Sequence, residues 1–112
     1  MHWGPKIPTL AVGEVPADAY LLDVRTAEEW AAGHAPAAHH IPMMEIPERL
    51  RDIPTDRPVH VVCRVGQRSA QVVAYLVAQG FDNVVNVDGG MLDWAAAGLG
   101  VVGEDGRAGG IA

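Results

Sequence analysis

The chain has 112 residues, a length that fits one compact domain and is too short for two. Hydrophobic residues make up 49% of it and charged residues 20%, which is a globular composition and not a disordered one. Fourteen acidic against eight basic side chains give a net charge of −6, which argues against binding to nucleic acid or to anionic lipid.

Apolar runs and cysteine usage exclude further classes. No apolar run approaches the roughly 18 residues that a membrane span needs, and residues 1–6 lack the apolar core of a secretory signal. We therefore expect a cytoplasmic domain with no membrane contact. Cys63 is the one cysteine in the sequence, so an internal disulfide, CxxC redox chemistry and a cysteine-rich zinc site are excluded.

The first third of the chain predicts short strands and one short helix. Residues 7–12 predict an edge strand or an ordered arm, and residues 20–24 form an apolar run typical of a buried strand. Thr26 and Glu29 then have the spacing of a capping box, which predicts the start of a helix. Gly33 is expected to end this helix.

The middle of the chain predicts two more strands. Residues 39–42 indicate a brief strand that ends at a proline, and Pro47 is placed to begin a helix over residues 48–52. The β-branched run at residues 59–63 is the clearest strand of the sequence.

The last third predicts a long helix, a strand and a short helix. Apolar residues at helical spacing predict a helix over residues 69–79, ended by Gly80. Residues 84–87 predict a further strand and residues 91–97 a last helix. We expect residues 1–102 to form the domain and residues 103–112 to form a flexible, glycine-rich tail.

Strands that alternate with helices over short connections predict an α/β domain with a mostly parallel central sheet, flanked by helices on both faces. Ligands of such sheets bind at the carboxyl ends of the strands. Two polar segments follow predicted strands, at residues 23–25 and 63–68, and we expect both to face one site.

The segment from Cys63 to Ser69, called the cysteine loop from here on, lies between the clearest strand and the longest helix. Gly66 permits a tight curl in which backbone N–H groups point inward, ahead of the positive end of the helix dipole. Arg64 and Arg68 add two positive charges. Each of these features favours a thiolate, so the sequence predicts that Cys63 is a nucleophile inside an anion-binding loop.

The cysteine loop resembles the active-site loop of the single-domain rhodaneses, a family of sulfurtransferases, in which four residues separate the cysteine from an arginine. The resemblance extends over about residues 7–102, and it rests on further segments at 23–25, 29–36, 41–42, 80–87 and 89–94. One departure is His39-His40, where such chains usually have a small residue and asparagine near the Ile-Pro pair.

The resemblance implies a ping-pong transfer of sulfane sulfur through a persulfide on Cys63, from thiosulfate or a related persulfide donor to cyanide or a thiol. It implies that Arg68 braces the loop and that Arg64 recruits the anionic donor. The other implied roles are substrate binding by Val65, Gly66, Gln67 and Ser69, and support by Asp23 and Arg25. No cofactor is expected. No metal is expected either, because the histidines lack the spacing of metal ligands. A protein that accepts the sulfur is a further possible partner.

Two other functions compete with this reading. A cysteine phosphatase or arsenate reductase has five residues between cysteine and arginine, whereas this loop has four. A persulfide carrier or partner-binding module of the same family is the second alternative, and the sequence does not separate a carrier from a free-standing enzyme. Asp23 and Arg25 fit either substrate contact or a loop-bracing ion pair.

Overall fold

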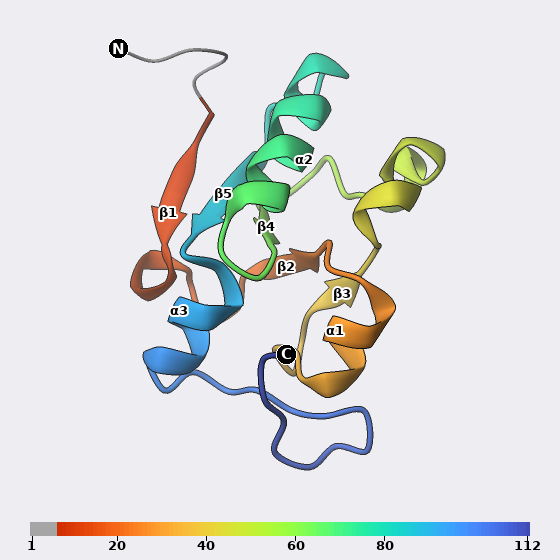
Figure 1. Cartoon of the computed structure of the whole chain (residues 1–112). Coiled ribbons are helices and arrows are strands. Elements are labelled where there is room, and N and C mark those ends of the chain that lie inside the picture. The colour runs from red at the N-terminus through yellow and green to blue at the C-terminus, as the bar shows by residue number, and fades with distance from the viewer. Residues whose placement is uncertain (1–6) are drawn as a thin grey trace.

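Within residues 7–112, which the computed structural model describes, five short strands form one fully parallel sheet (Figure 1). Their order is β1-β5-β4-β2-β3. The strands are β1 (Thr9–Ala11), β2 (Tyr20–Asp23), β3 (His39–His40), β4 (Val59–Val62) and β5 (Val84–Asp88). The parallel α/β fold expected from the sequence is thereby confirmed, whereas the expectation for residues 1–6 lies outside the described residues.

Helices connect the strands. They are α1 (Ala27–Ala32), α2 (Gln67–Ala78) and α3 (Gly90–Ala96), with 3-10 helices η1 (Val12–Glu14), η2 (Met43–Glu48) and η3 (Leu50–Asp52). The prediction of one helix over residues 48–52 that begins at Pro47 is wrong. Pro47 lies inside η2, and the separate 3-10 helix η3 begins at Leu50. The helix predicted over residues 69–79 begins two residues earlier, directly after Gly66, whose φ of 106° is left-handed.

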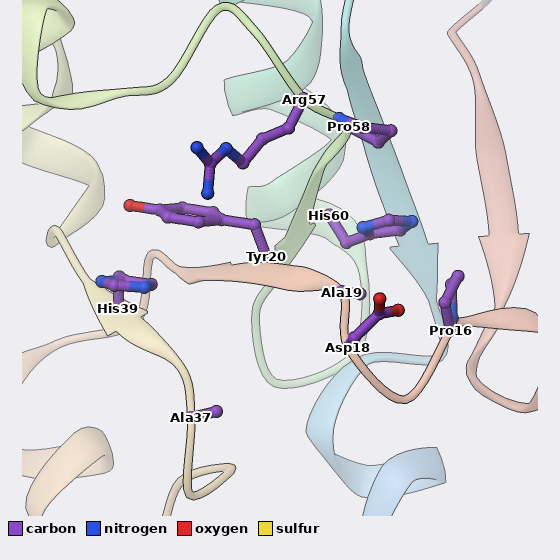
Figure 2. Close-up of a pocket in the computed structure, with 9 residues that line it drawn as sticks. All are labelled: Pro16, Asp18, Ala19, Tyr20, Ala37, His39, Arg57, Pro58 and His60. Atoms are coloured by element: carbon purple, nitrogen blue, oxygen red, sulfur yellow. The ribbon is translucent and has the colours of Figure 1, made fainter.

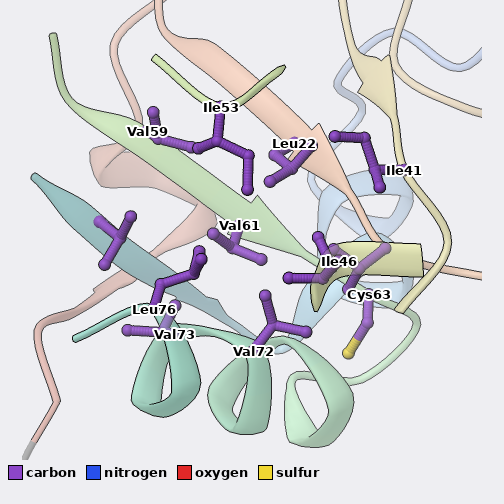
Figure 3. Close-up of a cluster of buried hydrophobic side chains, with 12 residues drawn as sticks. Leu22, Ile41, Ile46, Ile53, Val59, Val61, Cys63, Val72, Val73 and Leu76 are labelled. Atoms are coloured by element: carbon purple, nitrogen blue, oxygen red, sulfur yellow. The ribbon is translucent and has the colours of Figure 1, made fainter. Parts of the chain in front are cut away.

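Two apolar clusters cover the two faces of the sheet. On one face, Val72, Val73 and Leu76 of α2 pack on β4 and β2, and Ile46 and Ile53 close this cluster (Figure 3). On the other face, the second cluster includes Leu21, Ala35, Val62, Val87 and Met91. All four residues of β4 are buried, so this strand is the centre of the core.

The short helix α1 forms as its sequence predicts. Thr26 Oγ1 accepts the Glu29 N–H over 3.2 Å, and Glu29 Oε1 accepts the Thr26 N–H over 3.0 Å, which is the reciprocal pattern of a capping box. Gly33 follows as the C-terminal cap.

The C-terminal segment folds back toward α1 (Figure 1). Val102 bridges His34 and Ala108, and the Gly110 N–H donates to the Ala32 carbonyl over 3.1 Å. The predicted flexibility of residues 103–112 remains a prediction. None of the helices formed by residues 7–112 has the length and apolar character that crossing a membrane requires.

Candidate active site

The two polar segments singled out in the sequence lie at the same edge of the sheet. Asp23 ends β2 and pairs in register with Val62, the last residue of β4, so both strands deliver the chain to the same place. The Val24 N–H donates to the Val62 carbonyl over 3.0 Å and continues this pairing by one residue. Cys63 follows at once and opens the cysteine loop.

The Cys63 sulfur lies on the floor of the cysteine loop, beside the first turns of α2 (Figure 3). The Gly66 N–H donates to Sγ over 3.1 Å, and Ser69 Oγ lies 3.3 Å from it. Burial, with only 1% of Cys63 exposed, by itself raises the pKa of the thiol. Hydrogen bonds from the Ser69 hydroxyl and from the backbone N–H groups of Ser69, Gly66 and Val65 outweigh it, so the pKa of Cys63 is below its ordinary value.

The first turn of α3 keeps the cysteine loop in this conformation. The Met91 N–H donates to the Cys63 carbonyl over 2.8 Å, and the Leu92 N–H donates to the Arg64 carbonyl over 3.0 Å. With these carbonyls bound on the outside of the loop, its N–H groups are left to face inward. Nothing in the sequence indicated this contact, because the loop and the start of α3 are more than 20 residues apart in the chain.

Arg68 is bound to Glu29 of α1. Its two terminal nitrogens donate to the two carboxylate oxygens over 2.6 and 2.8 Å, and 34% of the Arg68 side chain remains exposed. The hydrogen bond from Arg68 is the main reason why the pKa of Glu29 falls to about 2. The partners are 39 positions apart in the chain, so no local sequence pattern indicated the pair.

The exposed residues of the loop form its mouth. Arg64, Val65 and Gln67 are exposed, whereas Gly66 and Ser69 are buried beneath them. Arg64 Nε donates to the backbone oxygen of Ala112 over 2.9 Å, which draws the C-terminal segment toward the mouth.

Asp23 and Arg25 form a buried ion pair next to the loop. Arg25 Nε and a terminal nitrogen donate to the Asp23 carboxylate over 3.0 and 2.8 Å, and both side chains are fully buried. The same terminal nitrogen donates to the Gly33 carbonyl over 2.7 Å. The pair therefore joins the end of β2 to the end of α1, in the manner of a brace.

Asn86 is a further residue of the site that the sequence analysis did not single out. It lies within β5, and its Oδ1 accepts the Ser69 hydroxyl over 2.6 Å. In the sequence, Asn86 interrupts the apolar run at 84–87 and matches no functional motif, so nothing there indicated its role.

A pocket of about 430 Å³ lies at the other end of the sheet, where the strands begin (Figure 2). The rings of Tyr20 and His39 stack there at 4.1 Å between centroids. This pocket is separate from Cys63, which follows the opposite end of β4. Among residues 7–112, no cluster of three or more His, Cys, Asp or Glu side chains is placed to hold a metal ion.

Buried thiol, inward N–H groups and a flanking guanidinium together form a site for a nucleophile and an anion. Residues 11–97 match the sequence model of the family described as Rhodanese-like domain. A sulfurtransferase of Allochromatium vinosum is 46% identical over 89 residues, which cover 80% of this chain and 83% of that protein.

Two further relatives agree with this match. The thiosulfate sulfurtransferase GlpE of Pseudomonas putida is 41% identical over 78 residues, which cover 70% of this chain and 71% of that one. The crystal structure of a rhodanese-like domain protein from Staphylococcus aureus has a TM-score of 0.73 and 39% identity, and the match covers 79% of this chain and 91% of that one.

Proposed function

Since the chain belongs to the rhodanese-like family of sulfurtransferases, we propose that it moves a sulfane sulfur from thiosulfate or a persulfide donor to cyanide or a thiol. The sulfur would be carried as a persulfide on Cys63. The observation that carries this proposal is the Cys63 sulfur at the floor of the cysteine loop, with the Gly66 N–H donating to it and Ser69 Oγ 3.3 Å away. The relative named a thiosulfate sulfurtransferase supports the choice of donor.

The proposed reaction has two displacement steps at sulfur. The Cys63 thiolate attacks the outer sulfur of thiosulfate, the bond between the two thiosulfate sulfurs breaks, and sulfite leaves with the electron pair. Cyanide or a thiolate then attacks the outer sulfur of the persulfide. Thiocyanate or a new persulfide leaves, and the Cys63 thiolate returns.

Each residue of the loop has a part in this proposal. The outer persulfide sulfur carries negative charge and extends toward the mouth, where the loop N–H groups and Arg64 favour an anion. Arg68 braces the loop through Glu29, and Asp23 and Arg25 support it from β2. The reduced Cys63 on which the cycle depends favours a cytoplasmic location.

Intact mass spectrometry after incubation with thiosulfate tests the proposal. We expect the mass to rise by one sulfur atom, the gain to disappear on addition of cyanide, and the Cys63→Ser variant to show no gain. Absence of the adduct in the wild-type protein would contradict the assignment of Cys63. An adduct that forms with thiosulfate but is not removed by cyanide, and is removed only by a protein acceptor, would instead indicate a persulfide carrier.

A further inference from the structure

The Ser69 hydroxyl lies between two groups that are both able to accept its proton. Ser69 Oγ is 3.3 Å from Cys63 Sγ, and it donates to Asn86 Oδ1 over 2.6 Å. All three residues are buried, and even Asn86 is only 4% exposed. A hydroxyl carries one proton, so Ser69 donates to only one of the two groups at a time.

Ionisation of Cys63 reverses the demand on this proton. In the thiol form, the S–H group donates to Ser69 Oγ while Ser69 donates to Asn86. A thiolate only accepts, so the Ser69 hydroxyl has to turn toward the sulfur for their contact to be favourable. The oxygen of Ser69 then presents lone pairs to Asn86, and a carbonyl oxygen at 2.6 Å would repel them.

We propose that Asn86 is a positioning residue whose carboxamide rotates when Cys63 ionises and thereby aims the Ser69 hydroxyl at the sulfur. A rotation of roughly 180° exchanges Oδ1 for Nδ2, whose N–H then donates to Ser69 Oγ. The thiol proton leaves to water, and no covalent bond of Ser69 or Asn86 changes. This inference rests on the proposed function, because it assigns a purpose to the thiolate of Cys63.

The surroundings of Asn86 permit this rotation. Among residues 7–112 the carboxamide makes no hydrogen bond except that to Ser69, so turning it breaks no other bond. Its backbone is fixed, because Asn86 pairs with Thr9 of β1 and Val61 of β4 and its N–H donates to the Pro8 carbonyl over 2.8 Å. The side chain therefore turns about a stationary Cα.

A carboxamide is suited to this position because it offers a donor and an acceptor in one planar group. An ionised aspartate would offer acceptors only and would hold the Ser69 proton away from the sulfur. A leucine of similar size would offer neither a donor nor an acceptor, so no N–H group would donate to Ser69 Oγ once the hydroxyl has turned toward the sulfur. Cys63 should therefore have its lowest pKa with asparagine at position 86.

Charged groups from every neighbouring element surround the thiol, and the substitution of Asn86 by leucine changes none of them. They are Arg64 in the loop, Arg68 of α2 with its partner Glu29 of α1, the Asp23–Arg25 pair after β2, and Asp88 at the end of β5. A change in the titration of Cys63 in this variant therefore reports on the carboxamide.

The test is the titration of Cys63, followed by thiolate absorbance and by the rate of alkylation with iodoacetamide. We expect Asn86→Leu to raise the pKa of Cys63 by about one unit, which corresponds to about tenfold slower alkylation below that pKa. Asn83→Leu is the matched control, because Asn83 binds the Pro54 carbonyl away from the site. It should not move the titration.

The Ser69→Ala background separates a relay from a packing effect. In that background, adding Asn86→Leu should leave the pKa of Cys63 equal to that of the Ser69→Ala variant. An unchanged pKa in the single Asn86→Leu variant, or an equal shift in both backgrounds, would overturn the proposal. These readouts need no sulfur transfer, so a failure of the proposed function, seen as no persulfide by mass spectrometry, is distinguishable from a failure here.

A measurement on the unmodified side chain covers the case in which Asn86→Leu does not fold. The ¹⁵N and ¹H resonances of the Asn86 side-chain amide should titrate with the same midpoint as Cys63, and this titration should be lost in Ser69→Ala. Amide resonances that stay constant across the Cys63 titration, or that still titrate without the Ser69 hydroxyl, would overturn the inference.

Discussion

Arg64 is exposed at the mouth of the cysteine loop, with its Nε bound to the backbone oxygen of Ala112. The rest of its guanidinium can meet an anionic donor in solvent. We expect Arg64→Ala to raise the KM for thiosulfate about fivefold, with little change in kcat. A fivefold change corresponds to the loss of ~1 kcal/mol of binding free energy, which is typical of an exposed charge pair.

Steady-state thiosulfate:cyanide kinetics check this expectation. Arg51→Ala is the matched control, because it removes the same charge from the exposed face of η3. Equal effects of the two substitutions would show that Arg64 acts only through the net charge of the protein.

Glu29 gives the protein a pH dependence of stability. Its pKa is lowered from 4.5 to about 2 in the folded state, chiefly by Arg68, so the carboxylate stabilises the fold above pH 4.5. This contribution is lost as the pH falls from 4.5 to 2, because protonation then favours the unfolded chain. After allowance for solvent screening at Arg68, we expect about 1–2 kcal/mol.

Urea unfolding at pH 7 and pH 3 measures this contribution. Glu29→Gln should be less stable than the wild type at pH 7 and should lose less stability on acidification. Glu28→Gln, an exposed neighbour in the same helical turn, should follow the wild-type profile. Parallel profiles for Glu29→Gln and the wild type would contradict the role of the Arg68 pair.

At the scale of single residues, the sequence predicts local contacts better than distant ones. The capping box of Thr26 and Glu29 depends on neighbours three residues apart, so its pattern is visible in the chain. The bond from Glu29 to Arg68 and that from Ser69 to Asn86 join segments that only the sheet brings together. The low pKa of the thiol was predicted from inward backbone N–H groups, the helix dipole and two arginines together; in the structure, hydrogen bonds from Ser69, Gly66 and Val65 are the causes that lower it.

At the scale of elements, the start of α3 is fitted to the cysteine loop through Gly90. Its φ of 56° is left-handed, and a Cβ there would overlap the carbonyl groups of Cys63 and Arg64. Gly90→Ala should therefore push the loop away from α3. We expect a loss of stability above the ~1–2 kcal/mol of backbone strain alone, and a raised pKa of Cys63.

Gly98→Ala is the matched control for this prediction. Gly98 also has a left-handed φ, of 77°, but a Cβ there meets open space. Thermal unfolding and thiolate titration of both variants separate strain from overlap. If Gly90→Ala and Gly98→Ala lose equal stability and neither changes the pKa of Cys63, the contact between α3 and the loop does not control the thiol.

The elements themselves follow from the sequence to different degrees. The strand run at 59–63 is predicted because β-branched residues repeat without interruption, and β4 is found there. The structure around Pro47 is not predicted by the sequence. A proline, which has no N–H, fits both the first turn of an α-helix and the interior of the 3-10 helix η2. Burial of Ile46 under α2 decides between them, and this contact is non-local.

At the scale of the whole molecule, stability should decline from the centre of the sheet outward. β4 is buried along its length between β5 and β2, whereas residues 103–112 bond mainly to one another and to α1. Amide hydrogen exchange should be slowest in β4 and fastest in residues 103–112, which also tests the expected flexible tail. Protection of the tail equal to that of β4 would contradict that expectation.

The fold class could be predicted from the alternation of strands and helices, because this pattern permits few arrangements. The position of β1 at the edge of the sheet, next to β5, could not be predicted. Its three residues pair with β5, close to the other end of the chain, and the sequence near Thr9 contains no information about that partner.

The contact between the cysteine loop and α3 bears on the order in which the protein matures during synthesis. The carbonyl groups of the cysteine loop are bound by Met91 and Leu92, which leave the ribosome well after Cys63 does. A nascent chain that stops short of these residues holds the thiol without its amide cradle. We therefore expect the thiol to become fully reactive only after α3 has been synthesised and has docked on the loop, so that a shorter nascent chain is less open to modification at Cys63.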